Sequence, residues 1–231
     1  MKKVLLLLLL VLSTGFAKAQ MITAEDVERV VAQTYGVQPE TGKEYMELAD
    51  RLVSQYPLDM NNQLTFTSII EVPGKTKDQI YVSLHSWFVS SFNSGKSAVQ
   101  MTDKEQGVIL AKGYLSGVGS RVGFAKSVVV GAYIVIRLDI KDEKVRLITS
   151  IQEYYMDTSV GVGQILFGGT APKDITIPVY LGYPFDSNKY KMYKRETAIG
   201  YVGGIVYSQI LKNKVQNAIN FGLTGTDNSN W

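Results

Sequence analysis

The chain has 231 residues, with 24 Lys and Arg against 21 Asp and Glu, a single histidine and no cysteine. Without cysteine there are no disulfide bonds, so stability has to come from a buried core, which a chain of this length can build. A zinc site or a nucleophile–histidine pair would have almost no residues to draw on. We therefore expect no metal, no cofactor and no catalytic residue.

The N-terminus has the three parts of a secretory signal peptide. Lys2 and Lys3 precede an unbroken apolar run from Val4 to Leu12, and Ala17-Lys18-Ala19 has the small-x-small pattern that signal peptidase cleaves. A membrane anchor is the alternative, but a spanning helix needs about 20 apolar residues. We expect residues 1–19 to be removed and the protein to be exported, periplasmic or secreted, with no transmembrane anchor left.

Removal of this segment changes the charge balance. Three lysines leave with it, so that 21 basic residues of the original 24 remain against 21 acidic ones. A balanced charge argues against nucleic acid as a partner and against a general polyanion-binding role, although it does not exclude a local cationic patch.

Residues 20–60 have the pattern of an N-terminal helical segment. Thr23 suits a helix N-cap, and Val27, Val30 and Val31 share one face of the helix that follows it. A second stretch, "TGKEYMELADRLVSQY", repeats the helical spacing of apolar residues. The two helices are expected to pack against the main domain, residues 61–221.

The main domain begins with a strand, since "QLTFTSIIEV" alternates in polarity until Pro73-Gly74. Thr76 to Gln79 fits a capping box that starts a helix running to about Phe92. On this helix Trp87, Phe88 and Phe92 are expected to anchor the core. His85 lies at the margin of the apolar face without an acidic or nucleophilic neighbour, so we interpret it as a boundary residue, not a reactive one.

The remaining segments predict more strands and a final helix. Four stretches rich in Val, Ile and Tyr follow, and the tight polar connection from Lys141 to Lys144 joins the last two as a hairpin. Residues 156–195 form a Gly-, Pro- and Tyr-rich loop, residues 196–221 a helix, and residues 222–231 a flexible tail. The fold class is α+β, in the order β-α-β(4)-α: an antiparallel sheet of about five strands with helices on one face.

Three stretches carry a resemblance to a known family. "GKTKDQIYVSLHSWFVSSFNS", "VQMTDKEQGVILAKGYL" and "IRLDIKDEKVRLITSIQEY" resemble domain-of-unknown-function family 4468, exported bacterial proteins with a TBP-like fold. The resemblance covers residues 64–155 and implies a fold without an activity. Glu143 stands where the family turn usually has glycine, which puts a positive φ there in doubt. The stretch "SGVGSRVGF" and everything after Tyr155 are not explained by the resemblance.

The best candidate for recognition lies in "PVYLGYPFDSNKYKMYKR". Exposed aromatic rings next to cationic side chains suit a sugar, a peptide or an acidic surface. The alternative is a long loop clamped to the domain by its own tyrosines. The candidate binding residues are Tyr180, Tyr183, Phe185, Tyr190, Tyr193, Lys191 and Arg195.

Three functions remain open at this point. The first is an exported non-enzymatic binding domain whose partner is an envelope protein or a glycan. The second is a carrier that holds a small apolar ligand in a cavity between helix and sheet. The third is an enzyme acting on cell-envelope glycans through paired carboxylates, with Asp103 and Glu105 as the first pair to inspect. For that pair, a charged hairpin turn beside Lys104 is the simpler interpretation.

Overall fold

The computed structural model describes residues 22–37, 42–91, 98–122, 126–160, 174–186 and 188–222. The expected signal peptide and all but the first residue of the expected tail lie outside these ranges. The helices are α2 (Ala24–Tyr35), α3 (Gly42–Leu52), α4 (Lys77–Ser91) and α6 (Lys194–Phe221). The strands are β1 (Leu64–Glu71), β2 (Ala98–Asp103), β3 (Val108–Val122), β4 (Lys126–Lys141), β5 (Lys144–Val160) and β6 (Ile175–Pro178), and two 3-10 turns are η1 (Val179–Leu181) and η2 (Lys191–Tyr193).

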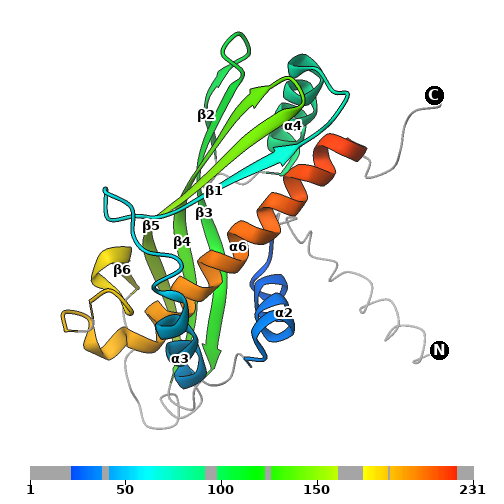
Figure 1. Cartoon of the computed structure of the whole chain (residues 1–231). Coiled ribbons are helices and arrows are strands. Elements are labelled where there is room, and N and C mark those ends of the chain that lie inside the picture. The colour runs from blue at the N-terminus through cyan, green and yellow to red at the C-terminus, as the bar shows by residue number, and fades with distance from the viewer. Residues whose placement is uncertain are drawn as a thin grey trace, which may run out of the picture.

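The strands form one antiparallel sheet in the order β1-β5-β4-β3-β2, with the short β6 also paired to β5 (Figure 1). β6 pairs with Glu153–Met156 of β5, beyond the part of β5 that pairs with β1. The expected α+β class, with an antiparallel sheet and helices packed on it, is confirmed. None of the helices described is long and apolar enough to span a bilayer.

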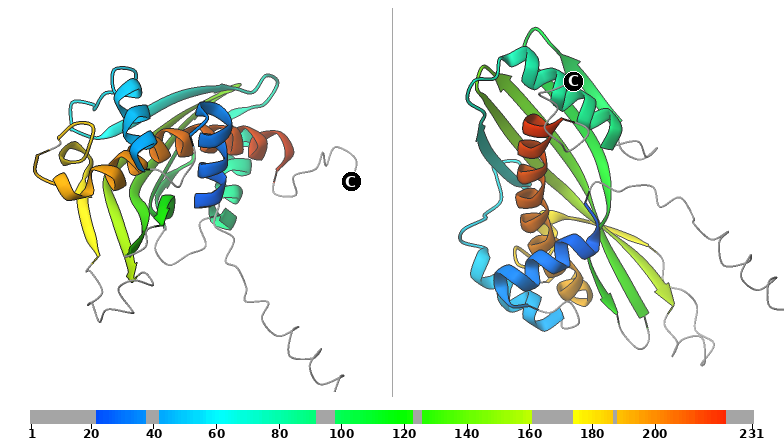
Figure 2. Two further views of the ribbon diagram at one scale, coloured as in Figure 1. Left: turned by 90° about the horizontal axis from the view of Figure 1, so that it is seen from below. Right: turned by 90° about the vertical axis from the view of Figure 1, so that its right-hand side faces the viewer.

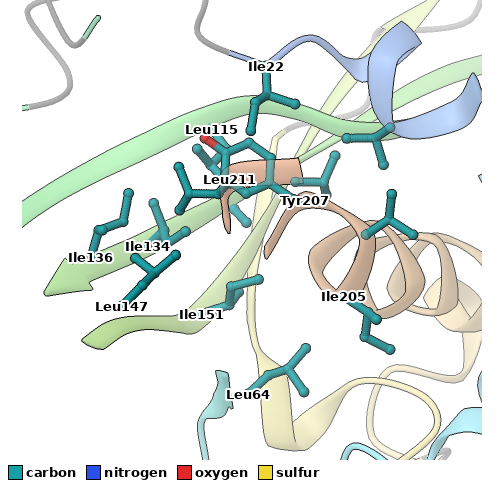
Figure 3. Close-up of a cluster of buried hydrophobic side chains, with 14 of the residues drawn as sticks. Ile22, Leu64, Leu115, Ile134, Ile136, Leu147, Ile151, Ile205, Tyr207 and Leu211 are labelled. Carbon is teal, nitrogen blue, oxygen red and sulfur yellow. The ribbon is translucent and has the colours of Figure 1, made fainter. Parts of the chain in front are cut away.

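Helix α6 lies along one face of the sheet (Figure 2), and small residues let it approach closely. A Cβ added at Gly203 would lie 2.0 Å from the carbonyl oxygen of Val118, and one at Gly204 would lie 2.5 Å from Ile151 Cδ1. Figure 3 shows buried side chains of the sheet, among them Ile134 and Ile151, in one cluster with Ile205 and Tyr207 of α6. The interface is therefore filled by the sheet and the helix themselves along this stretch.

The N-terminal helices pack on the same core. Val27 and Val31 of α2 and Leu48 of α3 are buried in one apolar cluster with α6 and the sheet. Thr23 caps α2 in a capping box with Asp26, as its position in the sequence predicts. The expected packing of the helical pair on the main domain is confirmed.

The expected capping box at Thr76 and the expected hairpin are also confirmed. The backbone N–H of Thr76 donates to Gln79 Oε1 at 2.9 Å, and that of Gln79 to Thr76 Oγ1 at 3.3 Å. Lys141 and Lys144 pair across the tight turn between β4 and β5. In that turn Glu143 has φ +60°. The turn therefore keeps a positive φ although the residue there is not glycine. The Glu143 carboxylate accepts a hydrogen bond from Gly74 N, which helps to hold the turn.

Three details differ from the prediction. Residues 116–122, which the resemblance does not explain, continue β3 past a register shift between Leu115 and Gly119. The expected loop 156–195 contains the end of β5, β6 and both 3-10 turns. Phe88 is fully buried, whereas Trp87, one position away from the buried helix face, packs against the core only partly buried. Phe92 lies outside the described residues.

Candidate anion-binding site

Most of the aromatic candidates hold their own segment in place. The Tyr183 hydroxyl donates to Asp50 of α3, and burial together with this bond raises the pKa of Tyr183 to about 12. Phe185 packs edge-on against Tyr201 of α6, with ring centroids 5.4 Å apart. Tyr190 and Tyr193 are half-buried against the core, and only Tyr180, at 44%, is largely exposed. Clamping is therefore the main role of these rings.

The cationic candidates meet at a pocket of about 400 Å³, called the cationic pocket below. It lies at the start of α6, where α3, β3 and η2 come together. Five of its lining residues are cationic, and one is acidic. The lining residues are Lys43, Met46, Arg121, Lys191, Met192, Lys194, Arg195 and Glu196.

The acidic member of the lining is bound to one of the cations. Glu196 is only 2% exposed, and its Oε1 accepts hydrogen bonds from Arg121 Nη2 at 2.7 Å and Nε at 3.2 Å. Arg121 is itself 18% exposed, so the pair forms the buried side of the pocket. A buried carboxylate requires such a partner, because an unpaired charge there would be costly. The Glu196 carboxylate is therefore paired with Arg121.

The helix beginning adds to the positive potential. Within the described part of the chain no side chain caps the N-terminus of α6, and Lys194 and Arg195 occupy its first turn just after Lys191. The free N–H groups of a helix N-terminus carry a partial positive charge, which makes cationic residues there unfavourable. An anion in the pocket would relieve the repulsion among these groups.

Gly42 shapes the wall formed by Arg195. A Cβ added at Gly42, the first residue of α3, would lie 2.9 Å from both Cβ and Cδ of Arg195. Glycine thus leaves the space in which the Arg195 stem lies. On the same turn of α3, Lys43 is 80% exposed and pairs with Glu47 at 3.5 Å, a contact that solvent weakens.

Residues 66–154 match the model of a family described as a domain of unknown function (DUF4468) with TBP-like fold. These residues form a DUF4468 domain. The match runs from β1 into β5, so it contains Arg121 and leaves Lys43, Lys191, Lys194 and Arg195 outside. The cationic pocket is therefore built where the DUF4468 domain meets the helices that flank it in the sequence.

Two solved structures are similar to this chain to different degrees. A TBP-like protein from Parabacteroides distasonis ATCC 8503 has a TM-score of 0.53 at 14% identity, over 72% of this chain and 98% of that one. A DUF4468 family protein from Bacteroides ovatus ATCC 8483 has a TM-score of 0.47 at 11% identity, over 79% and 96%. The first of these likenesses shows a shared fold. The sequence matches no curated protein.

The carboxylates proposed for catalysis lie in the β2–β3 turn of the DUF4468 domain. Asp103 accepts a hydrogen bond from the backbone N–H of Gln106, and Lys104 pairs with Asp78. The backbone carbonyl of Glu105 accepts from Lys77 Nζ. These contacts are those of a charged turn. The described residues contain no group of three or more His, Cys, Asp or Glu that could hold a metal ion.

Two other groups of aromatic side chains do not line the cationic pocket. His85 is half-buried and stacks on Tyr81, with ring centroids 5.9 Å apart. On the sheet, Tyr114, Tyr133 and Tyr155 contact one another from three adjacent strands. A hydrogen bond from its hydroxyl to Asp174 raises the pKa of Tyr155 to about 12.

Sequence reasoning found two of the five cations of the pocket, Lys191 and Arg195, and missed the other three. Lys43 and Arg121 are far from them in the sequence, and only the fold brings them together. Lys194 stood beside a predicted site residue. The signal that could have found it is a cluster of basic residues at the start of a helix, where cations are unfavourable.

Proposed function

We propose that the protein is an exported, non-enzymatic binding domain that holds an anionic ligand in the cationic pocket. The observation that carries this proposal is the convergence of five cationic side chains from separate elements on one pocket. Its volume, about 400 Å³, falls in the ordinary range for small-molecule sites, so it suits a small compound with an acidic group better than a bare ion.

The charge arrangement supports an anion over an apolar ligand. Glu196 pairs with Arg121 and Glu47 with Lys43, which leaves Lys191, Lys194 and Arg195 together with the N-terminus of α6 facing the same space. Like charges that face the same space repel one another, and an acidic ligand removes that repulsion. An acidic envelope glycan or a phosphorylated compound has the chemistry that such a pocket recognises.

The alternatives have less support. A carrier needs a cavity between helix and sheet, and the contacts of Gly203 and Gly204 fill that interface where α6 crosses the sheet. A carboxylate enzyme needs two acids facing a substrate, and Asp103 belongs to the bonding of a turn. The cationic pocket holds one carboxylate, which is bound to arginine, so it favours binding over acid–base chemistry.

Export is part of the proposal and is motivated by the sequence of residues 1–19. It is tested by expressing the full chain in a bacterial host and sequencing the N-terminus of the recovered protein. A mature N-terminus at Gln20 in the periplasmic or culture fraction supports export. Full-length protein in the cytoplasmic fraction contradicts it.

The binding proposal is tested by calorimetric titration of the protein beginning at Gln20. Inorganic phosphate, sulfate and glucuronate are the probes, each titrated at low and at high salt. We expect saturable binding of at least one probe, weakened by salt because the interaction is between charges. In the double variant Lys191→Ala/Arg195→Ala the affinity should fall about tenfold or more.

The matched control is Lys189→Ala. Lys189 lies in the same segment, near the Tyr190 ring, and does not line the pocket. The control removes one positive charge close to the pocket and leaves all five cationic lining residues in place. Equal losses in Lys189→Ala and in the double variant would indicate a diffuse charge effect and overturn the proposal, as would no binding of any probe to the wild type.

A further inference from the structure

Strand β1 is an open edge of the sheet. Among the described residues it pairs only with β5, along Leu64–Glu71 and without a register shift. At the opposite edge, β2 is shorter and its pairing shifts between Val99 and Met101. Proteins block exposed edges with short strands, bulges, lysine or proline, and β1 has none of these. At the end of the strand the Glu71 carbonyl accepts a hydrogen bond from Gln216 Nε2 of α6. Along Leu64–Ile70 no described strand pairs with the outer row of N–H and C=O groups, which is thus available for pairing.

A groove of about 480 Å³ lies between this edge and α6. Thr65, Phe66, Thr67 and Ser68 all line it, although neighbours in a strand point to opposite faces. Four consecutive lining residues therefore mean that the strand presents its edge to the groove. Figure 2 shows β1 running along α6. The remaining lining residues are Tyr56, Ile205, Ser208, Gln209, Lys212 and Asn213.

The α6 wall contains an unsatisfied polar atom. Ser208 is 6% exposed, and its hydroxyl has no hydrogen-bond partner within the part of the chain that the structure describes. Buried hydroxyl groups in proteins are normally paired, since an unpaired one costs free energy. A ligand in the groove that offers a donor or an acceptor would satisfy it.

We propose that an extended, acidic segment of another polypeptide binds in this groove as an additional strand beside β1. Its main chain pairs with the open edge, and its side chains on the inner side meet the polar wall of α6. Lys212 is the one charged residue of the lining, so it selects an acidic side chain. In β1 itself Leu64 to Ile70 are uncharged and the one acidic residue, Glu71, stands at the strand end, so another protein with an acidic residue in the middle of its strand is the better partner. This surface is separate from the cationic pocket and does not depend on it.

The test uses a defined probe, a capped peptide of alternating threonine and valine with one central aspartate. Hydrogen–deuterium exchange of residues 64–71 is followed in the intact mature protein with and without the peptide. We expect slower exchange in β1 with this peptide, and no effect from the same peptide N-methylated throughout, which has lost its backbone donors. Lys212→Ala should weaken binding about threefold, whereas Lys214→Ala, on the same helix outside the groove, should leave it unchanged.

A second variant separates binding from folding. Ser208→Ala removes the unsatisfied hydroxyl, so it should raise the melting temperature of the free protein while weakening peptide binding. The proposal is overturned if neither peptide slows exchange in β1, or if both do so equally. It is also overturned if the free protein is a dimer whose β1 is already protected, because the occupant would then be a second copy.

Discussion

Glu196 and Arg121 join the first turn of α6 to strand β3, through a carboxylate that is 2% exposed and a guanidinium that donates to it twice. The pair lies at the buried side of the cationic pocket, so the same contact supports both the fold and the site. It also explains why the acidic residue in the first turn of α6 does not offset the lysine and arginine beside it.

Removing one member of this pair should destabilise the protein strongly. Arg121→Met removes the guanidinium that donates twice to the buried Glu196 carboxylate, and we expect a loss of about 3–5 kcal/mol in the free energy of unfolding, measured by urea denaturation. The double variant Arg121→Met/Glu196→Gln should recover much of the loss, because the buried carboxylate charge is removed together with the guanidinium. Equal stabilities of the single and double variants would contradict this account of the pair.

Gly42→Ala should disturb the cationic pocket without changing a charge. The added Cβ would lie 2.9 Å from the Arg195 stem, which must move. We expect weaker binding of the anionic probe by calorimetry. Gly117→Ala is a matched control, since its Cβ would also meet a side-chain atom, Ala24 Cβ, at 2.9 Å but outside the pocket. A similar loss of affinity in both variants would show that the effect does not depend on Arg195.

The stability contribution of Tyr183 should depend on pH in the alkaline range. Its pKa is about 12 in the folded protein, against 10 for an ordinary tyrosine, first through burial and then through the bond to Asp50. Because the folded pKa is the higher one, the stabilisation is complete below about pH 10 and is lost as the pH rises toward 12. The free energy of unfolding, measured by denaturation at pH 9 and at pH 12, should therefore fall less between the two pH values in Tyr183→Phe than in wild type. Identical losses would contradict this role for Tyr183.

The turn at Glu143 allows two opposing effects to be separated. Its φ of +60° is unfavourable for a residue with a Cβ, whereas its carboxylate accepts a hydrogen bond from Gly74 N. Glu143→Ala keeps the strain and loses the bond, so we expect a loss of about 1 kcal/mol in unfolding free energy. Glu143→Gly loses the bond but relieves the strain, and its stability should stay close to wild type. Urea denaturation of both variants checks this order of stability. A Glu143→Ala variant more stable than Glu143→Gly would contradict it.

Local patterns predicted the elements whose sequence carries its own signal. The N-cap at Thr23, the capping box at Thr76 and the alternation along β4 are such cases, because neighbours in the chain decide them. β6 and the far part of β3 were missed, since glycine and polar residues weaken the alternation and only the adjacent strands hold these segments extended. The pocket could be predicted only in part. Lys43 and Arg121 reach it from α3 and β3, and such convergence has no signature in the sequence.

The central claim is that an anion binds where these cations converge. The most direct measurement is a ¹⁵N chemical-shift titration of the mature protein with whichever calorimetric probe binds best. We predict saturable shifts that cluster at Arg121, in η2 and in the first turn of α6, and that disappear in Lys191→Ala/Arg195→Ala. Shifts spread over the whole surface, or centred on the tyrosines of the sheet at Tyr114, Tyr133 and Tyr155, would contradict it.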